Sequence, residues 1–262
     1  MPRFAANLSF LWPDRPFMAR FDAAARAGFG AVEYMFPYAE QIDAVAGELR
    51  RLRLRQVLFN LPAGDWAGGD RGIAVDPARR SEFRQGVRVA MEIAHRLNCP
   101  RVNCLVGKQL ESVPVKEQWA CLVDNIKSAA AAFEKVGLVL LVEPINTYDI
   151  PGFFLRTTSE AFQLQDAVGA ANLKVQFDVY HAQRMEGNLT HTLKNNIGRI
   201  GHVQVADAPD RNQPGTGEIN FGYLFRALDR TDYGGEVGLE YRPAGGTDES
   251  FGWIEALGYA RR

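Results

Sequence analysis

The sequence is short of the residues that build several common kinds of site. It has four histidines and three cysteines in 262 residues, and the cysteines show no spacing typical of a zinc site or a disulfide framework. No apolar run approaches the roughly 20 residues that span a bilayer, and no signal-peptide pattern precedes the first strand-like segment. We therefore expect reduced thiols in a cytoplasmic protein without a membrane-spanning segment.

An excess of positive charge and a glycine-rich phosphate loop are also missing. The formal net charge is −1, which argues against a nucleic-acid partner, because nucleic-acid binders usually carry a basic excess. The first strand-like run leads into Asn7-Leu8-Ser9 and not into a GxGxxG turn, which disfavours an open, doubly wound dinucleotide-binding sheet. The apolar fraction of 47% is typical of a globular chain and suffices for a core of useful size.

Short apolar runs alternate with longer amphipathic runs from one end of the chain to the other. Several of the short runs, such as 138–142, are wholly apolar, as strands buried on both faces of a parallel sheet require. The pattern predicts eight strands, at Phe4–Ser9, Ala31–Met35, Gln56–Asn60, Val102–Val106, Val139–Glu143, Lys174–Asp178, His202–Asp207 and Glu236–Tyr241. It predicts helices at Phe17–Ala27, Pro77–Asn98, Pro114–Val136, Thr158–Gly169, Leu189–Ile197, Tyr223–Arg230 and Phe251–Tyr259.

This alternation favours a closed (β/α)8 TIM barrel over the open sheet. Residues 1–262 are predicted to form a single barrel domain, because no linker, charge run or low-complexity segment divides the chain. In such a barrel the carboxyl ends of all strands meet at one face, where the active sites of this fold lie.

Polar residues interrupt the ends of the last four predicted strands. Glu143, Asp178, Gln204 and Glu240 would converge on the same face, joined by Asp207. Crowded carboxylates repel one another, and a hard divalent cation relieves that repulsion. Oxygen donors favour Mg²⁺ or Mn²⁺ over zinc, so we predict a metal site here. Ordinary salt bridges or strand-end caps are the alternative for any one of these acids.

Further polar residues are expected around this site. His181, in a loop after strand six, could bind a substrate hydroxyl or move a proton. Arg211 and Lys108 are candidates for binding a substrate carboxylate, because both follow strands at the same face. His202 could pack inside the barrel or act in the site. The glycine-rich segment 64–72, which contains Trp66, is typical of a lid.

Taken together, these motifs resemble the hydroxypyruvate isomerase family within the xylose-isomerase-like barrels. The resemblance covers nearly the whole chain and lies in the segments Phe4–Ser9, Asn60–Trp66, Asn103–Lys108, Glu143–Asn146, Asp178–Gly187 and Pro214–Asn220. It implies a metal shell of Glu143, Asp178, Gln204 and Glu240, with Glu143 and Glu240 as an acid/base pair. Related keto-sugar epimerases carry a histidine where this chain has Gln204.

The resemblance implies an isomerase that interconverts hydroxypyruvate and 2-hydroxy-3-oxopropanoate through a metal-stabilised enediolate. A sister group, the 2-oxo-tetronate isomerases, is the alternative. Hydroxypyruvate isomerases read His-Asn at the end of strand three, whereas this chain reads Phe59-Asn60, as the sister group does. Both readings imply a small 2-keto sugar acid as substrate. A homo-oligomer stays open, because no interface can be read from the sequence.

Two other classes remain as alternatives. Barrels of this superfamily include metal-dependent endonucleases, which assemble several zinc ions with many histidines and a basic surface. Four histidines and a net charge of −1 disfavour that function. A non-catalytic binding protein would leave the paired glutamates and the metal ligands without a role.

Overall fold

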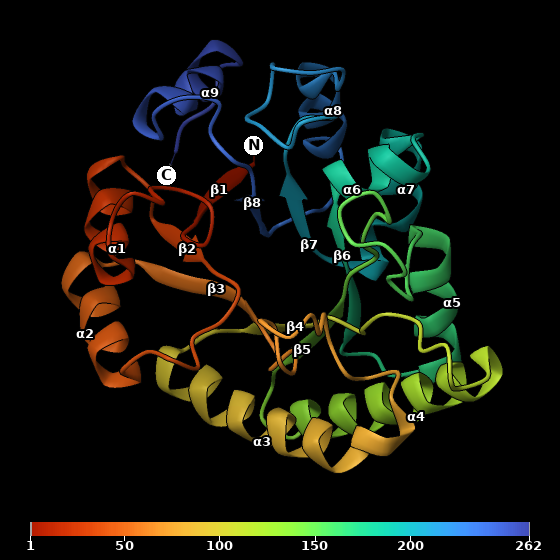
Figure 1. The fold of residues 1–262 in the computed structure, drawn as a ribbon. Helices are drawn as coiled ribbons and strands as arrows, with labels where there is room; N and C mark the ends of the chain where they lie inside the picture. The colour runs from red at the N-terminus through yellow and green to blue at the C-terminus, as the bar shows by residue number, and fades with distance from the viewer. Residues whose placement is uncertain (1, 262) are drawn as a thin grey trace.

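Eight parallel strands close into a barrel in the computed structural model, which describes residues 2–261. Each strand pairs with its neighbours in the chain, and β1 closes the ring against β8 (Figure 1). The predicted (β/α)8 barrel is therefore confirmed. The strands are β1 (Arg3–Asn7), β2 (Ala31–Glu33), β3 (Arg55–Asn60), β4 (Arg101–Cys104), β5 (Val139–Val142), β6 (Leu173–Asp178), β7 (Ile200–Val205) and β8 (Glu236–Leu239).

Helices surround the barrel and follow the chain around it (Figure 1). The α-helices are α1 (Phe17–Arg26), α2 (Ile42–Leu52), α3 (Arg80–Leu97), α4 (Val115–Glu134), α5 (Thr158–Val168), α6 (Val179–Met185), α7 (Leu189–Asn196), α8 (Phe221–Leu228) and α9 (Gly252–Ala256). Three 3₁₀ turns accompany them: η1 (Pro77–Arg79), η2 (Ile197–Arg199) and η3 (Asp248–Phe251). No helix in the described part of the chain is long and apolar enough to cross a membrane.

Two helices were not predicted from the sequence. Helix α2 has no side-chain cap at Gln41, and it ends at Arg53 in the left-handed conformation, where glycine is the usual signal. Helix α6 begins directly after β6, with Asp178 as its N-cap, so no loop separates the two elements. The last predicted helix is shorter than expected, because Phe251 belongs to η3 and α9 already ends at Ala256.

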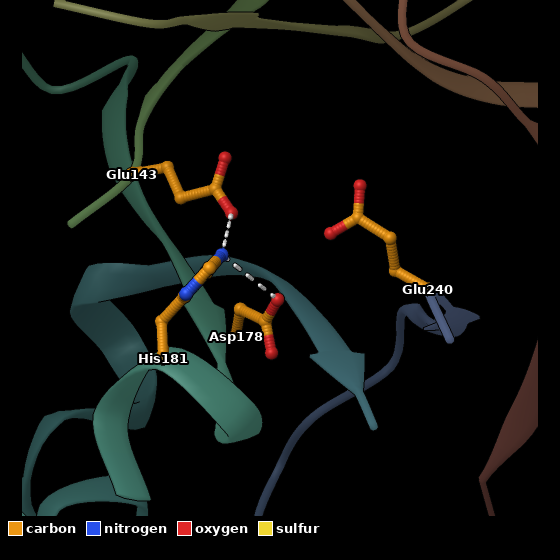
Figure 2. A group of neighbouring side chains, drawn as sticks. All are labelled: Glu143, Asp178, His181 and Glu240. Atoms are coloured by element: carbon orange, nitrogen blue, oxygen red, sulfur yellow. Dashed lines mark ion pairs between the residues drawn. The ribbon is translucent and has the colours of Figure 1, made fainter. Parts of the chain in front are cut away.

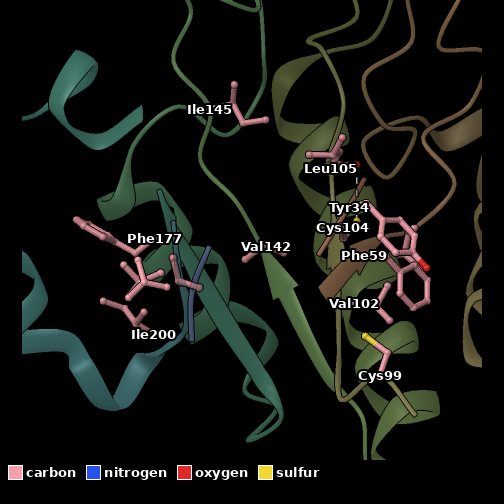
Figure 3. Close-up of a cluster of buried hydrophobic side chains, with 14 of the residues drawn as sticks. Tyr34, Phe59, Cys99, Val102, Cys104, Leu105, Val142, Ile145, Phe177 and Ile200 are labelled. Carbon is pink, nitrogen blue, oxygen red and sulfur yellow. Dashed lines mark hydrogen bonds between the residues drawn. The ribbon is translucent and has the colours of Figure 1, made fainter. Parts of the chain in front are cut away.

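Alternate residues of each strand face opposite sides of the barrel wall. The outward set belongs to one large buried cluster that packs against the helices, and Figure 3 shows Phe59, Val102, Cys104, Val142 and Phe177 within it. All three cysteines are buried free thiols. Four inward-facing strand residues, Ala5, Ala31, Leu58 and Leu141, form a separate, smaller apolar cluster together with Val57. Burying each large side chain stabilises the fold by roughly 1.5–3 kcal/mol relative to exposure.

The inward positions at the carboxyl ends of all eight strands are polar; six of these residues lie on the strands and two, Glu143 and Glu240, directly after them. These buried residues are Asn7, Glu33, Asn60, Asn103, Glu143, Asp178, Gln204 and Glu240. Strand register places several of them side by side, for example Asp178 opposite Gln204. The barrel thus carries a ring of polar side chains above its small apolar centre.

Glu33 on β2 links opposite walls of this ring. Its carboxylate accepts hydrogen bonds from Asn7 (2.9 Å) and Gln204 (2.7 Å), and it lies 2.7 Å from His202 Nε2. Strands β2 and β7 are not neighbours, so these contacts cross the barrel interior. Gly238 on β8 makes room for them, because a Cβ there would lie 2.2 Å from Glu33 Oε1.

Replacing Gly238 with Ala should therefore lower the free energy of unfolding by about 1–3 kcal/mol, the usual cost of overpacking. Urea denaturation checks this. Gly47→Ala on α2 is the matched control, because a Cβ there meets no atom within 4 Å, and this change should leave stability unchanged or raise it. A Gly238→Ala protein as stable as the wild type would contradict the packing described.

Candidate metal centre and active site

A cavity of about 740 Å³ opens at the carboxyl ends of the strands. Its floor includes two members of the polar ring that carry carboxylates, Glu143 and Glu240, together with His181 and Arg211. The remaining lining residues are Ser9, Phe10, Pro13, Met35, Asn60, Trp66, Arg71, Leu105, Ile145, Asp149, Ile150, Arg242 and Pro243. The fold thus brings four of the sequence-predicted site residues to one cavity.

Four buried side chains meet at this floor. One ligand atom from each of Glu143, Asp178, His181 and Glu240 lies within 4.8 Å of the others. Figure 2 shows the His181 ring pointing between Glu143 and Asp178, with Glu240 facing them from the segment directly after β8. Glu143 and Glu240 each follow directly on a strand, whereas Asp178 is the last residue of β6.

His181 lies on the first turn of α6, and not in a loop as predicted. The carboxylate of Asp178 starts this helix, because its Oδ1 accepts the backbone N–H of Tyr180 at 2.8 Å. Its other oxygen, Oδ2, is buried and accepts no hydrogen bond from any described residue. A buried carboxylate oxygen without a hydrogen bond is costly unless a cation contacts it.

The two glutamates are held by neighbouring members of the ring. Asn103 donates to Glu143 at 2.9 Å, and the same amide lies 3.2 Å from Asn60 Oδ1. On the opposite side, Arg211 Nη2 donates to Glu240 at 2.9 Å, and Asn7 lies at 3.5 Å. These contacts fix both carboxylates in orientation before any ligand binds.

Arg211 is the cation that the structure itself supplies to the carboxylates. Besides Glu240, its guanidinium lies 3.7 Å from Asp178 and 3.3 Å from Asp149. The rings of Phe10 and Tyr180 flank it at 5.0 and 5.2 Å. Burial alone would lower the pKa of Arg211, but the surrounding carboxylates outweigh this and raise the pKa above its ordinary value.

The protein environment opposes ionisation of all three acids in the absence of a metal ion. Burial, reinforced by the charge of Asp178, raises the pKa of Glu143 to about 8. Burial also raises the pKa of Asp178 and, to a larger extent, that of Glu240, although Arg211 acts in the opposite direction on both. One arginine therefore does not neutralise the cluster.

This donor set fits a divalent cation. Three carboxylates converge, and one of their oxygens has no other hydrogen-bond partner in the described chain. A doubly charged ion would favour the ionised form of each acid and so reverse the direction of the three pKa shifts. The geometry is thus compatible with a metal centre at the base of the cavity.

The structure places Gln204 beside Asp178 by strand pairing. Its Oε1 accepts from Gln176 at 2.6 Å, and its Nε2 donates to Glu33. One lone pair of Oε1 is left for a further contact, because an amide oxygen has two. The role of Gln204 as a ligand stays a prediction.

His202 lies inside the barrel, where Glu33 is its partner.

Two other predicted residues lie elsewhere. Lys108 forms a short antiparallel bridge with Phe153 and does not line the cavity, so its role as a carboxylate anchor stays a prediction. Asp207 was expected to join the converging strand ends. Instead it follows β7, and its two oxygens accept backbone N–H groups of Ala208, Gly215, Gly217 and Ile219.

Two cations in the cavity lining were missed from the sequence. Arg71 and Arg242 form no ion pair with any residue in the range 2–261, so no carboxylate neutralises their charge. Arg71 Nη1 donates to the backbone oxygens of Trp66 (3.1 Å) and Asp70 (2.6 Å). Arg71 stacks on Trp66 at 4.0 Å, and Trp66 meets Phe36 edge-on at 5.1 Å. The predicted lid segment therefore does border the cavity. Both arginines lie outside strand ends, which explains why the strand pattern did not identify them.

A second cavity, of about 710 Å³, lies at the opposite end of the barrel. Its charged lining is arginine-rich, and its one carboxylate, Glu236, pairs with Arg3, Arg55 and Arg101. Such a lining cannot hold a cation. The carboxylate-lined cavity is therefore the candidate active site.

Comparison with known proteins agrees with the fold. A family model described as xylose isomerase-like TIM barrel matches residues 21–257. The chain is 48% identical to hydroxypyruvate isomerase of Escherichia coli K12, over 97% of this chain and 99% of that protein. It is 42% identical to 2-oxo-tetronate isomerase of Cupriavidus necator, over 97% and 98%.

Solved structures share the same architecture. A protein from Brucella melitensis, described as an AP endonuclease of family 2, superposes with a TM-score of 0.95 at 43% identity, covering 98% of this chain and 99% of that one. The 3-keto-D-glucoside 4-epimerase of E. coli superposes with a TM-score of 0.81 over 98% and 99%. At 20% identity, the latter match shows the fold alone.

The raised pKa values predict how stability depends on pH in the metal-free protein. A carboxyl whose pKa is higher in the folded state stabilises the fold below its unfolded pKa of 4.5, and this contribution is lost as pH rises towards about 8. The melting temperature in EDTA should therefore fall between pH 5 and 8. Calorimetry measures this fall.

Excess Mg²⁺ or Mn²⁺ should restore stability at pH 8, by about 2.7 kcal/mol at 100 times the dissociation constant. The variant Glu143→Gln should show a shallower pH dependence in EDTA, because one of the titrating groups is gone. A melting temperature that is constant or rises over this pH range in EDTA would show that folding does not raise the pKa values of these acids.

Proposed function

Because the chain belongs to the xylose isomerase-like TIM barrel family, we propose that it is an aldose–ketose isomerase that interconverts hydroxypyruvate and 2-hydroxy-3-oxopropanoate. The observation that carries this proposal is the pair of buried glutamates, Glu143 and Glu240, facing each other across the floor of a cavity that also contains free arginines. The 48% identity to a hydroxypyruvate isomerase over nearly the full length of both chains supports the choice of substrate.

The two glutamates are suited to move a proton between adjacent carbons. The reaction removes a proton from C3 of hydroxypyruvate and returns one to C2, by way of a planar enediolate. One of Glu143 and Glu240 takes the first proton, and one of the pair delivers the second. Burial raises the pKa of Glu143 in the metal-free site to about 8, and a bound divalent cation would lower it, so that the ionised carboxylate is available to take the proton.

We assign the metal ligands to Glu143, Asp178, Gln204 and Glu240, and the ion to Mg²⁺ or Mn²⁺. The assignment of the ion follows from the donors, since all four would offer oxygen atoms. When bound, such an ion supplies Lewis-acid stabilisation of negative charge on oxygen. Arg211, which already contacts Glu240 and Asp178, keeps these carboxylates in place.

A substrate carboxylate needs a cation that the protein has not already paired. Arg211 was the predicted anchor, but Glu240 and Asp149 engage both of its terminal nitrogens. Arg71 and Arg242 line the same cavity without such partners in the described chain. We therefore assign Arg71 and Arg242, in addition to Arg211, to binding of the substrate carboxylate. Arg211 is placed on the side of the reacting carbons.

One observation keeps 2-oxo-tetronate as the second candidate substrate. The cavity of about 740 Å³ has room for a fourth carbon. Phe59, which distinguishes this chain from hydroxypyruvate isomerases, is buried in the layer between barrel and helices beside Tyr38, and it does not line the cavity. Phe59 therefore makes no direct contact that could distinguish the two substrates.

The proposal is tested by proton NMR of the Mg²⁺-loaded enzyme in deuterated water, with hydroxypyruvate in one tube and 2-dehydro-tetronate in another. Loss of the C3 proton signal of hydroxypyruvate, with formation of the aldehyde, supports the proposal, and deuterium at C2 shows exchange of the transferred proton with solvent. Turnover in the tetronate tube alone moves the assignment to the second substrate. No turnover in either tube contradicts the isomerase function.

Replacing Glu143 with Gln should lower kcat by about 10²–10⁴-fold, the usual contribution of a positioned acid/base group. The fold should survive, because the change removes a buried charge and keeps the shape of the side chain. Steady-state kinetics and circular dichroism measure the two effects. Glu134→Gln, on the exposed end of α4, is the control and should keep full activity. A Glu143→Gln enzyme with a tenth of wild-type activity would remove Glu143 from this role.

A further inference from the structure

The two ring nitrogens of His181 face different surroundings. Nδ1 faces Asn146, whose side-chain nitrogen lies at 2.7 Å and whose backbone nitrogen lies at 3.4 Å. Nε2 points into the carboxylate cluster, 3.6 Å from Asp178 Oδ2 and 3.9 Å from Glu143 Oε1 (Figure 2). His181 and Asn146 are both buried.

The orientation of the Asn146 carboxamide is fixed by its own loop. Its Oδ1 accepts the backbone N–H groups of Tyr148 at 3.0 Å and Asp149 at 2.8 Å. A flipped amide would aim its NH₂ group at these two donors, so the oxygen must stay on the loop side. Nδ2 therefore faces His181, and it can only donate.

Two N–H donors thus point at Nδ1, and none of the contacting atoms there can accept a proton. Nδ1 must be the bare, accepting nitrogen of the ring. The single proton of the neutral imidazole then lies on Nε2. The charged imidazolium is disfavoured as well, since its Nδ1–H would confront both donors.

We propose that Asn146 is a positioning residue that fixes His181 as the neutral Nε2–H tautomer, so that His181 presents a hydrogen-bond donor to the reacting oxygens and is not a metal ligand. Neither neighbouring carboxylate is within the 2.7–3.2 Å of an ordinary N–H···O bond, so the N–H is free for a substrate oxygen. A donor fixed in advance at this place would stabilise negative charge that develops on that oxygen.

This assignment divides the four-residue cluster into two kinds of group. The three carboxylates, Glu143, Asp178 and Glu240, can bind a cation, whereas the nitrogen that His181 turns towards them carries a proton and has no lone pair to give. It also removes His181 from acid/base work, because Nε2–H is a very weak acid and Nδ1 is already occupied.

Asn146 acts through His181 and does not itself line the cavity. The same amide organises the turn that brings Asp149 to Arg211 and to the hydroxyl of Tyr180. A simple truncation of Asn146 would disturb that turn. Asn146→Asp avoids this, because it keeps the accepting oxygen towards Tyr148 and Asp149 and replaces only the NH₂ group by an oxygen.

The test is long-range ¹H–¹⁵N NMR of the full-length protein labelled at histidine nitrogens, with and without Mg²⁺. The chain has four histidines, and loss of one set of signals in His181→Asn assigns the ring. We expect an unprotonated Nδ1 and a protonated Nε2 in the wild type in both conditions. In Asn146→Asp, Nδ1 should become protonated, because its partner is now an acceptor.

Tyr180→Phe is the matched control. It breaks the contact between Tyr180 and Asp149 in the same loop but leaves both donors at Nδ1 in place, so the nitrogen signals of His181 should keep their wild-type pattern. A protonated Nδ1 in the wild type, or an unchanged Nδ1 in Asn146→Asp, would overturn the proposal. Loss of the Nε2 proton on addition of Mg²⁺ would overturn it too, because His181 would then be a ligand.

Only the use of this donor towards a substrate rests on the proposed function. The tautomer is read from the ring nitrogens and needs no turnover, so an enzyme that is inactive on both keto acids still gives a clear result. Conversely, an active isomerase with a protonated Nδ1 would refute the tautomer and leave the proposed function intact.

Discussion

The repulsion among three buried carboxylates is the constraint on which the rest of the site depends. Glu143, Asp178 and Glu240 lie within 4.8 Å of one another where little water reaches them. Both burial and mutual charge favour the protonated acids, and Arg211 offsets only part of this cost. A divalent cation removes the remaining conflict and turns a destabilising cluster into a binding site.

The barrel holds this cluster through a continuous polar network and not through isolated contacts. Glu33 receives hydrogen bonds from Asn7 and Gln204 across the interior, and Asn7 reaches on to Glu240. On the other side, Asn103 holds Glu143. Each member comes from a different strand, so the position of each carboxylate depends on the closure of the whole sheet. Small residues such as Gly238 leave the space that these larger polar side chains fill.

The barrel and the heart of the site could be predicted from the sequence because both follow from the alternation of strands. Parallel strands read as apolar runs, and polar residues at their ends must converge, which identified Glu143, Asp178 and Glu240. Residues whose positions depend on where a helix begins or on a loop conformation show no such pattern in the sequence. His181 was expected in a loop, since nothing in the sequence shows that Asp178 both ends β6 and caps α6.

Arg71, Arg242 and Asn146 were missed for the same reason. Their positions are set by loop conformations, which the period of two along a strand does not describe. Asp207 was misplaced because it resembles a strand-end acid in sequence, whereas its oxygens are used by the backbone of the following loop. Specific side-chain contacts of this kind are a property of the folded chain and not of local pattern.

The most direct test of the central claim is the binding of Mn²⁺ to the EDTA-treated protein, followed by electron paramagnetic resonance. The account predicts one tightly bound Mn²⁺ per chain in the wild type, and loss of that ion in Asp178→Asn, which removes the charge from the carboxylate whose oxygen has no other hydrogen bond. An absence of bound Mn²⁺ in the wild type, or equal binding in the variant, would contradict it.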